Sequence, residues 1–471
     1  MAALVAAGAG YGLYRWQTHR LTGPTIVATD RIQVPEPARD VDPAAPAGQT
    51  RPAANSLRRE RGTPLSPTLL TRPSDDGRLW YVGKPTTESL VEIPFPPGLK
   101  PGAPPVMEFV RENPGFLGAQ ACQSCHRDKY ETFVHTAHHL TSRPGMPEFI
   151  RGSFEPGENR MRTANPDLVF TMIQRNDRCY QKVNFYDWEF EVPIDLVTGS
   201  SKLAQTFLFW DFDALYQMNV THLTESDRWI NSPGYFDGDA AYARPIGARC
   251  LECHTTYADF RRQPNHFTPN SLILGVSCER CHGPGRPHVA YHLQHPEEKA
   301  AKFVSVPTDF PRQRQLDICG QCHSGASDLK GLPYSFRPGD RLDDHYHPID
   351  QAELQNSVHA SNQASRLAIS KCFKQSEMAC ADCHNPHRKE RGQTALFSSR
   401  CIKCHAPEHC GQSESLGDAI RDNCIDCHMP NEQTQNMRLE TPEGDVFPPL
   451  RDHYIRIDAK ATERYLSELA D

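Results

Sequence analysis

The sequence has little of the apolar material that usually fills the interior of a chain of its length. Hydrophobic residues make up 38% of the 471 residues, and 40 prolines and 30 glycines interrupt much of the remainder. Length alone would suggest about three domains. So low an apolar content argues against three conventional side-chain cores and indicates that another apolar group fills part of the interior.

Positive charge and long hydrophobic runs are also scarce. The formal net charge is −7 with histidine neutral, which gives no support to nucleic-acid binding. The apolar stretch at residues 2–16 would form a helix of about 22 Å, short of the roughly 30 Å hydrocarbon core of a bilayer. It has no basic region before it and no clear cleavage site. We favour a retained membrane anchor at residues 1–22 over a cleaved export signal, and the alternative is an apolar arm packed on a partner protein.

One motif of cysteine and histidine, in contrast, occurs seven times. In each copy, two cysteines are separated by two residues and followed at once by histidine. This motif is typical of haem c attachment, in which the thiols bond to the porphyrin vinyl groups and the adjacent imidazole is the proximal iron ligand. The predicted sites 1 to 7, in chain order, are Cys122, Cys125 and His126; Cys250, Cys253 and His254; Cys278, Cys281 and His282; Cys319, Cys322 and His323; Cys380, Cys383 and His384; Cys401, Cys404 and His405; and Cys424, Cys427 and His428.

Other uses of paired cysteines fit the pattern less well. Tetrahedral zinc takes its remaining ligands from a second hairpin and does not need histidine directly after the second cysteine. A thioredoxin-like pair would occur once, and structural disulfides would not repeat one spacing. The sequence therefore predicts seven covalent haem c groups, which would supply the missing apolar interior. Because haem c is attached outside the cytoplasm, we expect a periplasmic or other extracytoplasmic location, with membrane anchoring.

The expected fold is an α-rich, irregular multihaem cytochrome c with a small β-sheet insert and an extended proline-rich N-terminal arm. Aromatic and β-branched runs divided by turn signals predict strands at residues 168–173, 179–185, 188–195 and 205–210. Helices are expected at residues 350–371 and 459–469. The predicted segments are a signal or anchor (1–22), the arm (23–115), a first haem module with the β-rich insert (116–249), a six-haem stack (250–458) and a C-terminal helix (459–471).

The second axial ligand decides what each iron can do. An iron with two imidazoles can only pass electrons, whereas a five-coordinate iron can bind a small molecule. The chain has 22 histidines, so fifteen remain beside the seven proximal ones, and His19 lies in the leader. His387 and His409 follow a proximal histidine so closely that they lie on its side of the porphyrin, and we expect them to serve neighbouring haems. Met429 is excluded from its own iron for the same reason and should pack against the macrocycle.

Several phrases resemble the bacterial multihaem cytochrome c-554 type family. They are CERCHGPGRPHVAYH at site 3, VHASNQASRLAISKCF before site 5, CIDCHMP at site 7 and RDHYIRI near the C-terminus, with TAHHLTS after site 1 and DRWINSPGY before site 2. The resemblance covers about residues 116–458. It implies seven distal iron ligands, which are His138, His288, His292, His359, His387, His409 and His453. His135 and His139 remain alternatives to His138.

Three cysteines lie outside the attachment motifs. Cys372 and Cys410 flank sites 5 and 6, and an oxidising compartment favours a disulfide between them. Cys179 is interpreted as a buried strand residue. His345 and His347 in the phrase DDHYH remain candidates for a ligand or a metal pair.

These features predict electron transfer along seven haems, between a membrane or periplasmic donor and an acceptor protein. The expected partners are redox proteins and, through the N-terminus, a membrane or membrane complex. One alternative is an oxidoreductase that acts on a small nitrogen or sulfur compound at one open haem iron, and another is a structural subunit of a larger complex. No Cys-x-x-Cys-Lys motif occurs, so a lysine-ligated catalytic haem is not expected, and no catalytic residue is assigned.

The first prediction concerns the number of haems. Because all seven motifs are complete, the intact chain should carry seven covalent haem additions by mass spectrometry, in agreement with its pyridine haemochrome. Five or fewer additions, or zinc in place of iron, would contradict the interpretation of the motifs.

Overall fold

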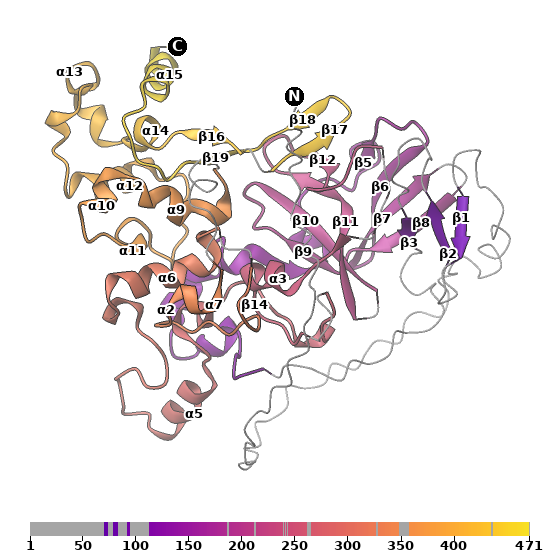
Figure 1. Ribbon diagram of the computed structural model, residues 1–471, viewed down its shortest axis with the longest axis horizontal. Helices are drawn as coiled ribbons and strands as arrows, with labels where there is room; N and C mark the ends of the chain where they lie inside the picture. The colour runs from indigo at the N-terminus through magenta and orange to yellow at the C-terminus, as the bar shows by residue number, and fades with distance from the viewer. Residues whose placement is uncertain are drawn as a thin grey trace, which may run out of the picture. The chain divides into compact units, whose positions relative to one another are not determined.

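The computed structural model describes residues 113–470, apart from short gaps, and three strands nearer the N-terminus (Figure 1). The gaps are residues 186–187, 212, 239, 241, 243, 261–264, 326–327, 348–357 and 435–436. All described residues belong to one compact unit, Pro52–Asp471. In this part of the chain, no helix has the length and apolar character needed to cross a membrane. The expected signal or anchor at residues 1–22 lies outside the described residues.

A three-stranded antiparallel sheet lies within the segment that the sequence predicts to be an extended arm. Its strands are β1 (Leu70–Pro73), β2 (Leu79–Val82) and β3 (Glu92–Pro94), in the order β1-β2-β3. The expectation of a wholly extended arm is therefore wrong for these residues. Pro73 and Pro94 each end a strand, where a proline interrupts the ladder least. The rest of the arm as far as residue 112 lies outside the described residues.

Two larger antiparallel sheets form the β region between sites 1 and 2. One has the order β5-β6-β7-β8, and the other the order β12-β11-β10-β9-β4 with β13 on β11. Their bounds are β4 (Ser142–Pro144), β5 (Arg160–Arg162), β6 (Leu168–Arg175), β7 (Arg178–Phe185), β8 (Trp188–Pro193), β9 (Leu196–Thr198), β10 (Ala204–Asp211), β11 (Ala214–Leu223), β12 (Arg228–Asn231) and β13 (Arg244–Pro245). The strands predicted from the aromatic and β-branched runs are confirmed as β6, β7, β8 and β10.

Local sequence explains the hairpins of this region. β6 and β7 pair from Leu168 opposite Phe185 to Arg175 opposite Arg178. The two-residue loop between them contains Asn176 at φ 51°, a left-handed conformation that asparagine tolerates. Both sheets bury side chains in one shared core, which includes Phe170, Val183 and Phe207. The chain is therefore less α-rich than predicted, because two sheets replace the single small insert.

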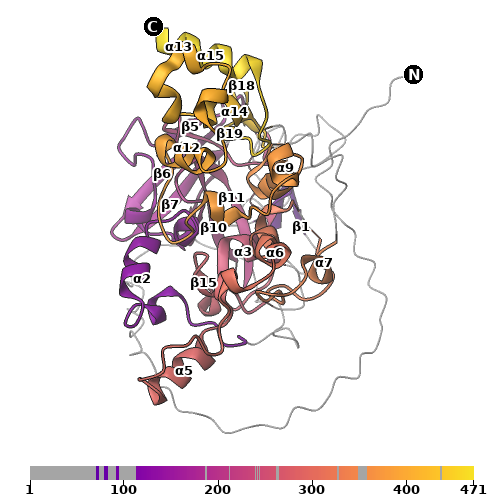
Figure 2. The same ribbon diagram turned by 90° about the vertical axis from the view of Figure 1, so that its left-hand side faces the viewer.

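Short helices dominate the part of the chain that carries sites 2 to 7. They are α3 (Ala248–His254), α4 (Glu279–His282), α5 (Arg286–Gln294), α6 (Arg312–His323), α7 (Leu342–His345), α9 (Gln363–Ala368), α10 (Lys371–Lys374), α11 (Cys380–Cys383), α12 (Thr394–Ile402), α13 (Ser413–Leu416), α14 (Ile425–His428) and α15 (Ala459–Ala470). Site 1 is followed by α2 (Arg127–Phe133). In Figure 1 and Figure 2, α5, α6, α12 and α14 follow one another in space in their chain order.

This helical part has almost no side-chain core. Among the described residues after site 3, the buried hydrophobic ones are Ile318, Tyr334, Phe336, Tyr346, Val358, Ala379, Ile420, Cys427, Leu439 and Ala461. So few apolar side chains cannot offset the entropy of ordering this length of chain. The sequence expectation that attached haems provide the interior accounts for this property.

Two expectations for this part need correction. The structure has free thiols at Cys372 and Cys410, so the predicted disulfide is wrong. The helix predicted over residues 350–371 is largely wrong where it can be compared: α9 begins only at Gln363, and the chain breaks at Ser370 before α10. Residues 350–357 lie outside the described residues. The C-terminal helix is confirmed as α15, and Cys179 is confirmed as a buried residue of β7.

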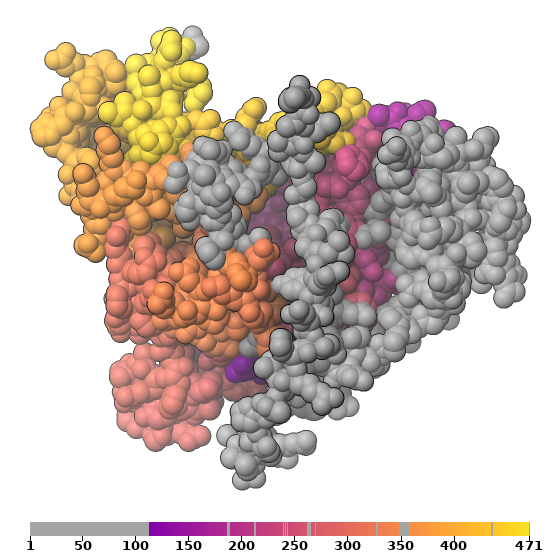
Figure 3. All heavy atoms as spheres, viewed as in Figure 1, coloured from indigo at the N-terminus to yellow at the C-terminus, as the bar shows by residue number. Residues whose placement is uncertain are grey.

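A C-terminal hairpin returns to the β region (Figure 1, Figure 3). Its strands are β17 (Leu439–Thr441) and β18 (Gly444–Val446). The side-chain amide of Asn231 on β12 donates to the carbonyl oxygen of Glu440 at 2.9 Å, and the backbone N–H of Asp237 donates to the Glu440 carboxylate at 3.0 Å. The β region thus holds the segment that follows site 7.

The second prediction concerns Asp195, which is partly buried between β8 and β9 and accepts a hydrogen bond from the backbone N–H of Trp210 at 2.8 Å. Burial raises the pKa of Asp195 to about 6. An aspartate in the unfolded chain has a pKa of about 3.9. Because the folded protein holds this proton more tightly, the free energy of unfolding falls as the pH rises towards and through 6, where the carboxyl ionises in the folded state. At pH 8, Asp195→Asn should raise the free energy of unfolding by roughly 2 kcal/mol, with little effect at pH 4.

Denaturant titrations at both pH values measure this difference. Asp167→Asn, at an exposed aspartate of the same region, is the matched control. Equal effects of Asp195→Asn at the two pH values would show that the carboxyl is not neutral in the folded protein.

Candidate haem centres

Each attachment motif lies on a helical turn. The backbone N–H of the histidine donates to the carbonyl oxygen of the first cysteine at site 1 (2.9 Å), site 3 (2.9 Å), site 5 (3.0 Å), site 6 (3.0 Å) and site 7 (3.1 Å). Sites 2 and 4 lie within α3 and α6. Residues at positions i, i+3 and i+4 of a helical turn share one face. Both thiols and the imidazole therefore face one side, as attachment of a single planar porphyrin requires.

Hydrogen bonds at Nδ1 select the tautomer of four proximal histidines. Nδ1 of His282 donates to the carbonyl oxygen of Ser305 at 2.7 Å. In the same way, Nδ1 of His323 donates to the carbonyl oxygen of Ala360 at 2.7 Å, and Nδ1 of His428 donates to that of Arg456 at 2.9 Å. Nδ1 of His254 lies 3.0 Å from the hydroxyl of Thr141 and 3.4 Å from its carbonyl oxygen. A carbonyl oxygen can only accept, so Nδ1 carries the proton and Nε2 keeps a free lone pair for a metal. These partners are mostly backbone atoms, which leave no signal in the sequence.

Four proximal imidazoles each face a second imidazole. The pairs are His126 with His288, His282 with His387, His323 with His138, and His384 with His453, with ring centroids 6.2, 6.2, 6.2 and 6.0 Å apart. Two metal–nitrogen bonds of about 2.0 Å, plus about 1.1 Å from each nitrogen to its ring centroid, give a separation of about 6.2 Å. The residues present therefore fit one iron between the two rings of each pair.

The second imidazole of each pair comes from a segment next to a different attachment site. His138 follows site 1 and faces the ring of site 4, while His288 follows site 3 and faces that of site 1. His387 does not face its own neighbour His384 but the ring of His282 at site 3. Burial, followed by the charges of neighbouring imidazoles, lowers the pKa of His138 to about 4. Such rings are neutral at physiological pH, which is the form that binds a metal.

The other three histidines of the expected distal set are placed differently. His292 lies one turn after His288 on α5, with its ring centroid 4.5 Å from that ring and its Nε2 buried without a hydrogen-bond partner. Nδ1 of His359 accepts from the backbone N–H of Ser361 at 3.1 Å. His409 is exposed. Across the described residues, no second imidazole faces His254, His405 or His428 at the spacing of the four pairs.

His345 in the DDHYH segment does not form a metal-binding pair with His347 in this structure. Nδ1 of His345 lies 2.9 Å from the hydroxyl of Ser335, and Nε2 lies 2.9 Å from a carboxylate oxygen of Asp340. Both ring nitrogens are thus occupied by protein groups. Residues 113–470, outside the gaps, contain no cluster of three or more groups suited to a metal ion.

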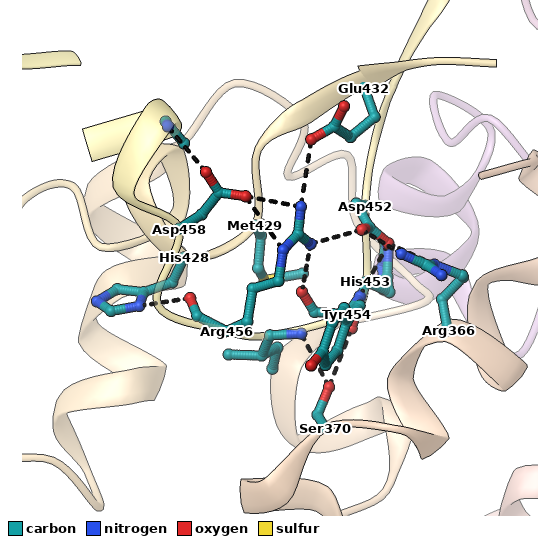
Figure 4. A network of polar contacts seen from close by, with 12 residues as sticks. Arg366, Ser370, His428, Met429, Glu432, Asp452, His453, Tyr454, Arg456 and Asp458 are labelled. Atoms are coloured by element: carbon teal, nitrogen blue, oxygen red, sulfur yellow. Dashed lines mark hydrogen bonds and ion pairs between the residues drawn. The ribbon is translucent and has the colours of Figure 1, made fainter. Parts of the chain in front are cut away.

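One buried ion-pair network lies beside histidines of site 5 and site 7 (Figure 4). Asp452 is fully buried and accepts from Nε and Nη2 of Arg366 at 2.8 and 2.6 Å and from Nη1 of Arg456 at 2.7 Å. His453, which faces the ring of site 5, follows Asp452 directly, and the carbonyl oxygen of Arg456 accepts from His428 of site 7. The RDHYIRI segment therefore positions His453, which faces site 5, and the backbone acceptor of His428 at site 7.

Several known proteins are similar in sequence to this chain. Residues 234–283 match the family model described as cytochrome c554 and c-prime, and this stretch contains site 2 and site 3. Dissimilatory sulfite reductase MccA of Wolinella succinogenes is 21% identical over 67% of this chain and 50% of its own length. Multiheme cytochrome MtrA of Shewanella baltica is 26% identical over 29% of this chain and 44% of its own length.

The chain thus spans about half the length of these curated relatives. A solved structure, the outer cell wall cytochrome OcwA, is 16% identical with a TM-score of 0.47, covering 74% of this chain and 81% of that one. The family match and the curated relatives confirm the resemblance that the motifs indicate. The chain is similar in sequence to multihaem c-type cytochromes.

Proposed function

We propose that the chain is an extracytoplasmic electron-transfer cytochrome with seven covalently bound haem c groups. Bound haem supplies an iron that takes up and releases one electron at a time. The chain's own residues would hold four of the irons between facing imidazoles, and they keep neighbouring sites close. The four facing imidazole pairs carry this proposal, because an iron with two imidazole ligands has no position left for a substrate.

The proposed partners are redox proteins that donate and accept electrons. Association with a membrane or a membrane complex through the N-terminal segment belongs to the same proposal. The relative MtrA is named a multiheme cytochrome, which supports a role in electron transfer. For site 2, site 6 and site 7, the second ligands remain a prediction, with His292, His359 and His409 as the candidates.

A second candidate function is supported by the site that His254 occupies. His254 faces no second imidazole within the described part of the chain, although the hydrogen bond at its Nδ1 leaves Nε2 for a metal, as at sites 3, 4 and 7. An open iron there would let the protein reduce or oxidise a small nitrogen or sulfur compound. The relative MccA is named a dissimilatory sulfite reductase, so sulfite is the first compound to test.

The third prediction tests the facing pairs at site 3. His387→Ala should open the iron held by His282, adding a high-spin component to the oxidised spectrum, and added imidazole should restore the low-spin form. The haem count should stay at seven, because His387 takes no part in attachment. His295→Ala, at a histidine near the end of α5, is the matched control. An unchanged low-spin spectrum in His387→Ala would contradict the assignment.

The fourth prediction separates the two candidate functions. The electron-transfer function predicts that the oxidised wild-type protein is entirely low-spin and that its electron paramagnetic resonance does not respond to sulfite, nitrite or hydroxylamine. Three facing pairs have ring planes 22° apart, whereas His138 and His323 are 64° apart, so site 4 should give a distinct, more anisotropic low-spin signal. A high-spin signal that changes on adding one of these compounds would favour the enzyme.

A further inference from the structure

The residues inside the attachment motifs link one site to another, and these links do not follow chain order. Glu279, the residue after the first cysteine of site 3, is buried. Its carboxylate accepts from the backbone N–H groups of Leu117 and Gly118 at 2.8 and 2.7 Å, just before site 1. The turn of site 3 is therefore joined directly to the start of site 1, although site 2 lies between them in the sequence.

The turns of sites 2, 3 and 4 meet at one buried junction. The residue before the second cysteine is Glu252 at site 2, Arg280 at site 3 and Gln321 at site 4, and these three side chains are 0%, 4% and 3% exposed. Gln321 donates to the carbonyl oxygen of Arg280 at 3.1 Å, and Arg280 donates to that of Glu252 at 3.2 Å. Arg249 closes the ring by donating to the carbonyl oxygen of Gln321 at 2.7 Å.

The later sites are linked one after another. Arg312 on the helix of site 4 donates to the carbonyl oxygen of Met378, just before site 5, at 2.8 Å. Arg400, just before site 6, donates to the carbonyl oxygen of Cys383 of site 5 at 2.6 Å. The hydroxyl of Ser398 accepts from the backbone N–H of Cys424 of site 7 at 2.9 Å. The successive positions of α6, α12 and α14 in Figure 2 agree with this order.

We infer that electrons pass in the spatial order of sites 1, 3, 4, 5, 6 and 7, with site 2 as a side branch joined to sites 3 and 4. This inference rests on the proposed function. Electron transfer slows steeply with distance, so it follows the turns that are bonded together. A side branch can receive or release electrons without interrupting the path between the two ends, as a reservoir or a reaction site would require.

The test injects electrons beside site 2 and times their arrival elsewhere. A ruthenium photosensitiser is attached to the thiol introduced by Pro245→Cys, at an exposed position five residues before Cys250. The full haem-loaded chain is used, and it also carries Cys372→Ser and Cys410→Ser so that these two thiols do not react with the label. His387→Ala, His138→Ala and His288→Ala each open one iron and so place a high-spin marker at site 3, site 4 and site 1. After a flash, the markers of sites 3 and 4 should be reduced several-fold faster than that of site 1.

Simultaneous or earlier arrival at site 1 would overturn the order, since it would place site 2 between sites 1 and 3. Glu279→Ala should slow arrival at site 1 more than arrival at site 4, and Glu279→Gln, which keeps one acceptor oxygen, should restore part of the rate. Equal slowing at both markers would also contradict the order. If Pro245→Cys lowers the haem count, Asn270→Cys, before β15 (Ile273–Leu274), is the second labelling position. Electrons that reach no marker at all would instead refute the proposed electron-transfer function.

Discussion

The rest of the structure depends on one constraint, which is that the two axial ligands of an iron lie on opposite faces of its porphyrin. A helical turn can present two thiols and one imidazole to a single face, but it cannot reach the other. The second imidazole must come from a different segment, and here it comes from the neighbourhood of another attachment site. With iron bound, each such pair would tie two distant parts of the chain together, and ligation would then also act as a tertiary cross-link.

Buried polar groups do the positioning in the helical part, where apolar side chains are few. The junction of Glu252, Arg280 and Gln321 and the pair of Asp452 with Arg366 are almost wholly buried. Leaving one partner of such a pair uncompensated costs several kcal/mol, which makes the arrangement specific even where it adds little net stability. Rigid spacing matters for electron transfer, because its rate depends on the separation of neighbouring sites.

The β region has a different organisation, with a conventional side-chain core between two sheets. It nevertheless contributes to the sites. The carbonyl and hydroxyl oxygens of Thr141, just before β4, lie within reach of Nδ1 of His254, and the hydroxyl of Ser142 on β4 donates to the His254 carbonyl oxygen at 2.6 Å. The strands thus provide a rigid support for site 2, the one site that lies off the inferred path.

The sequence by itself determined the features that depend on short spacing. The seven attachment motifs, their proximal histidines, the hairpin at Asn176 and the helix α15 are local, because residues within one turn or one hairpin meet without help from the rest of the chain. The sequence also limited the distal ligands to a small set of histidines. Its proline content suggested an extended arm and hid the short strands β1 to β3.

Only the tertiary structure decided which imidazole faces which. His387 is close in sequence to His384 but faces His282, and His453 faces His384 across a long separation in the chain. The Nδ1 acceptors are backbone carbonyl oxygens that every residue possesses, so no residue type could reveal them. The separate thiols of Cys372 and Cys410 and the position of site 2 beside sites 3 and 4 have the same cause, which is that packing between distant segments leaves no periodic pattern in the sequence.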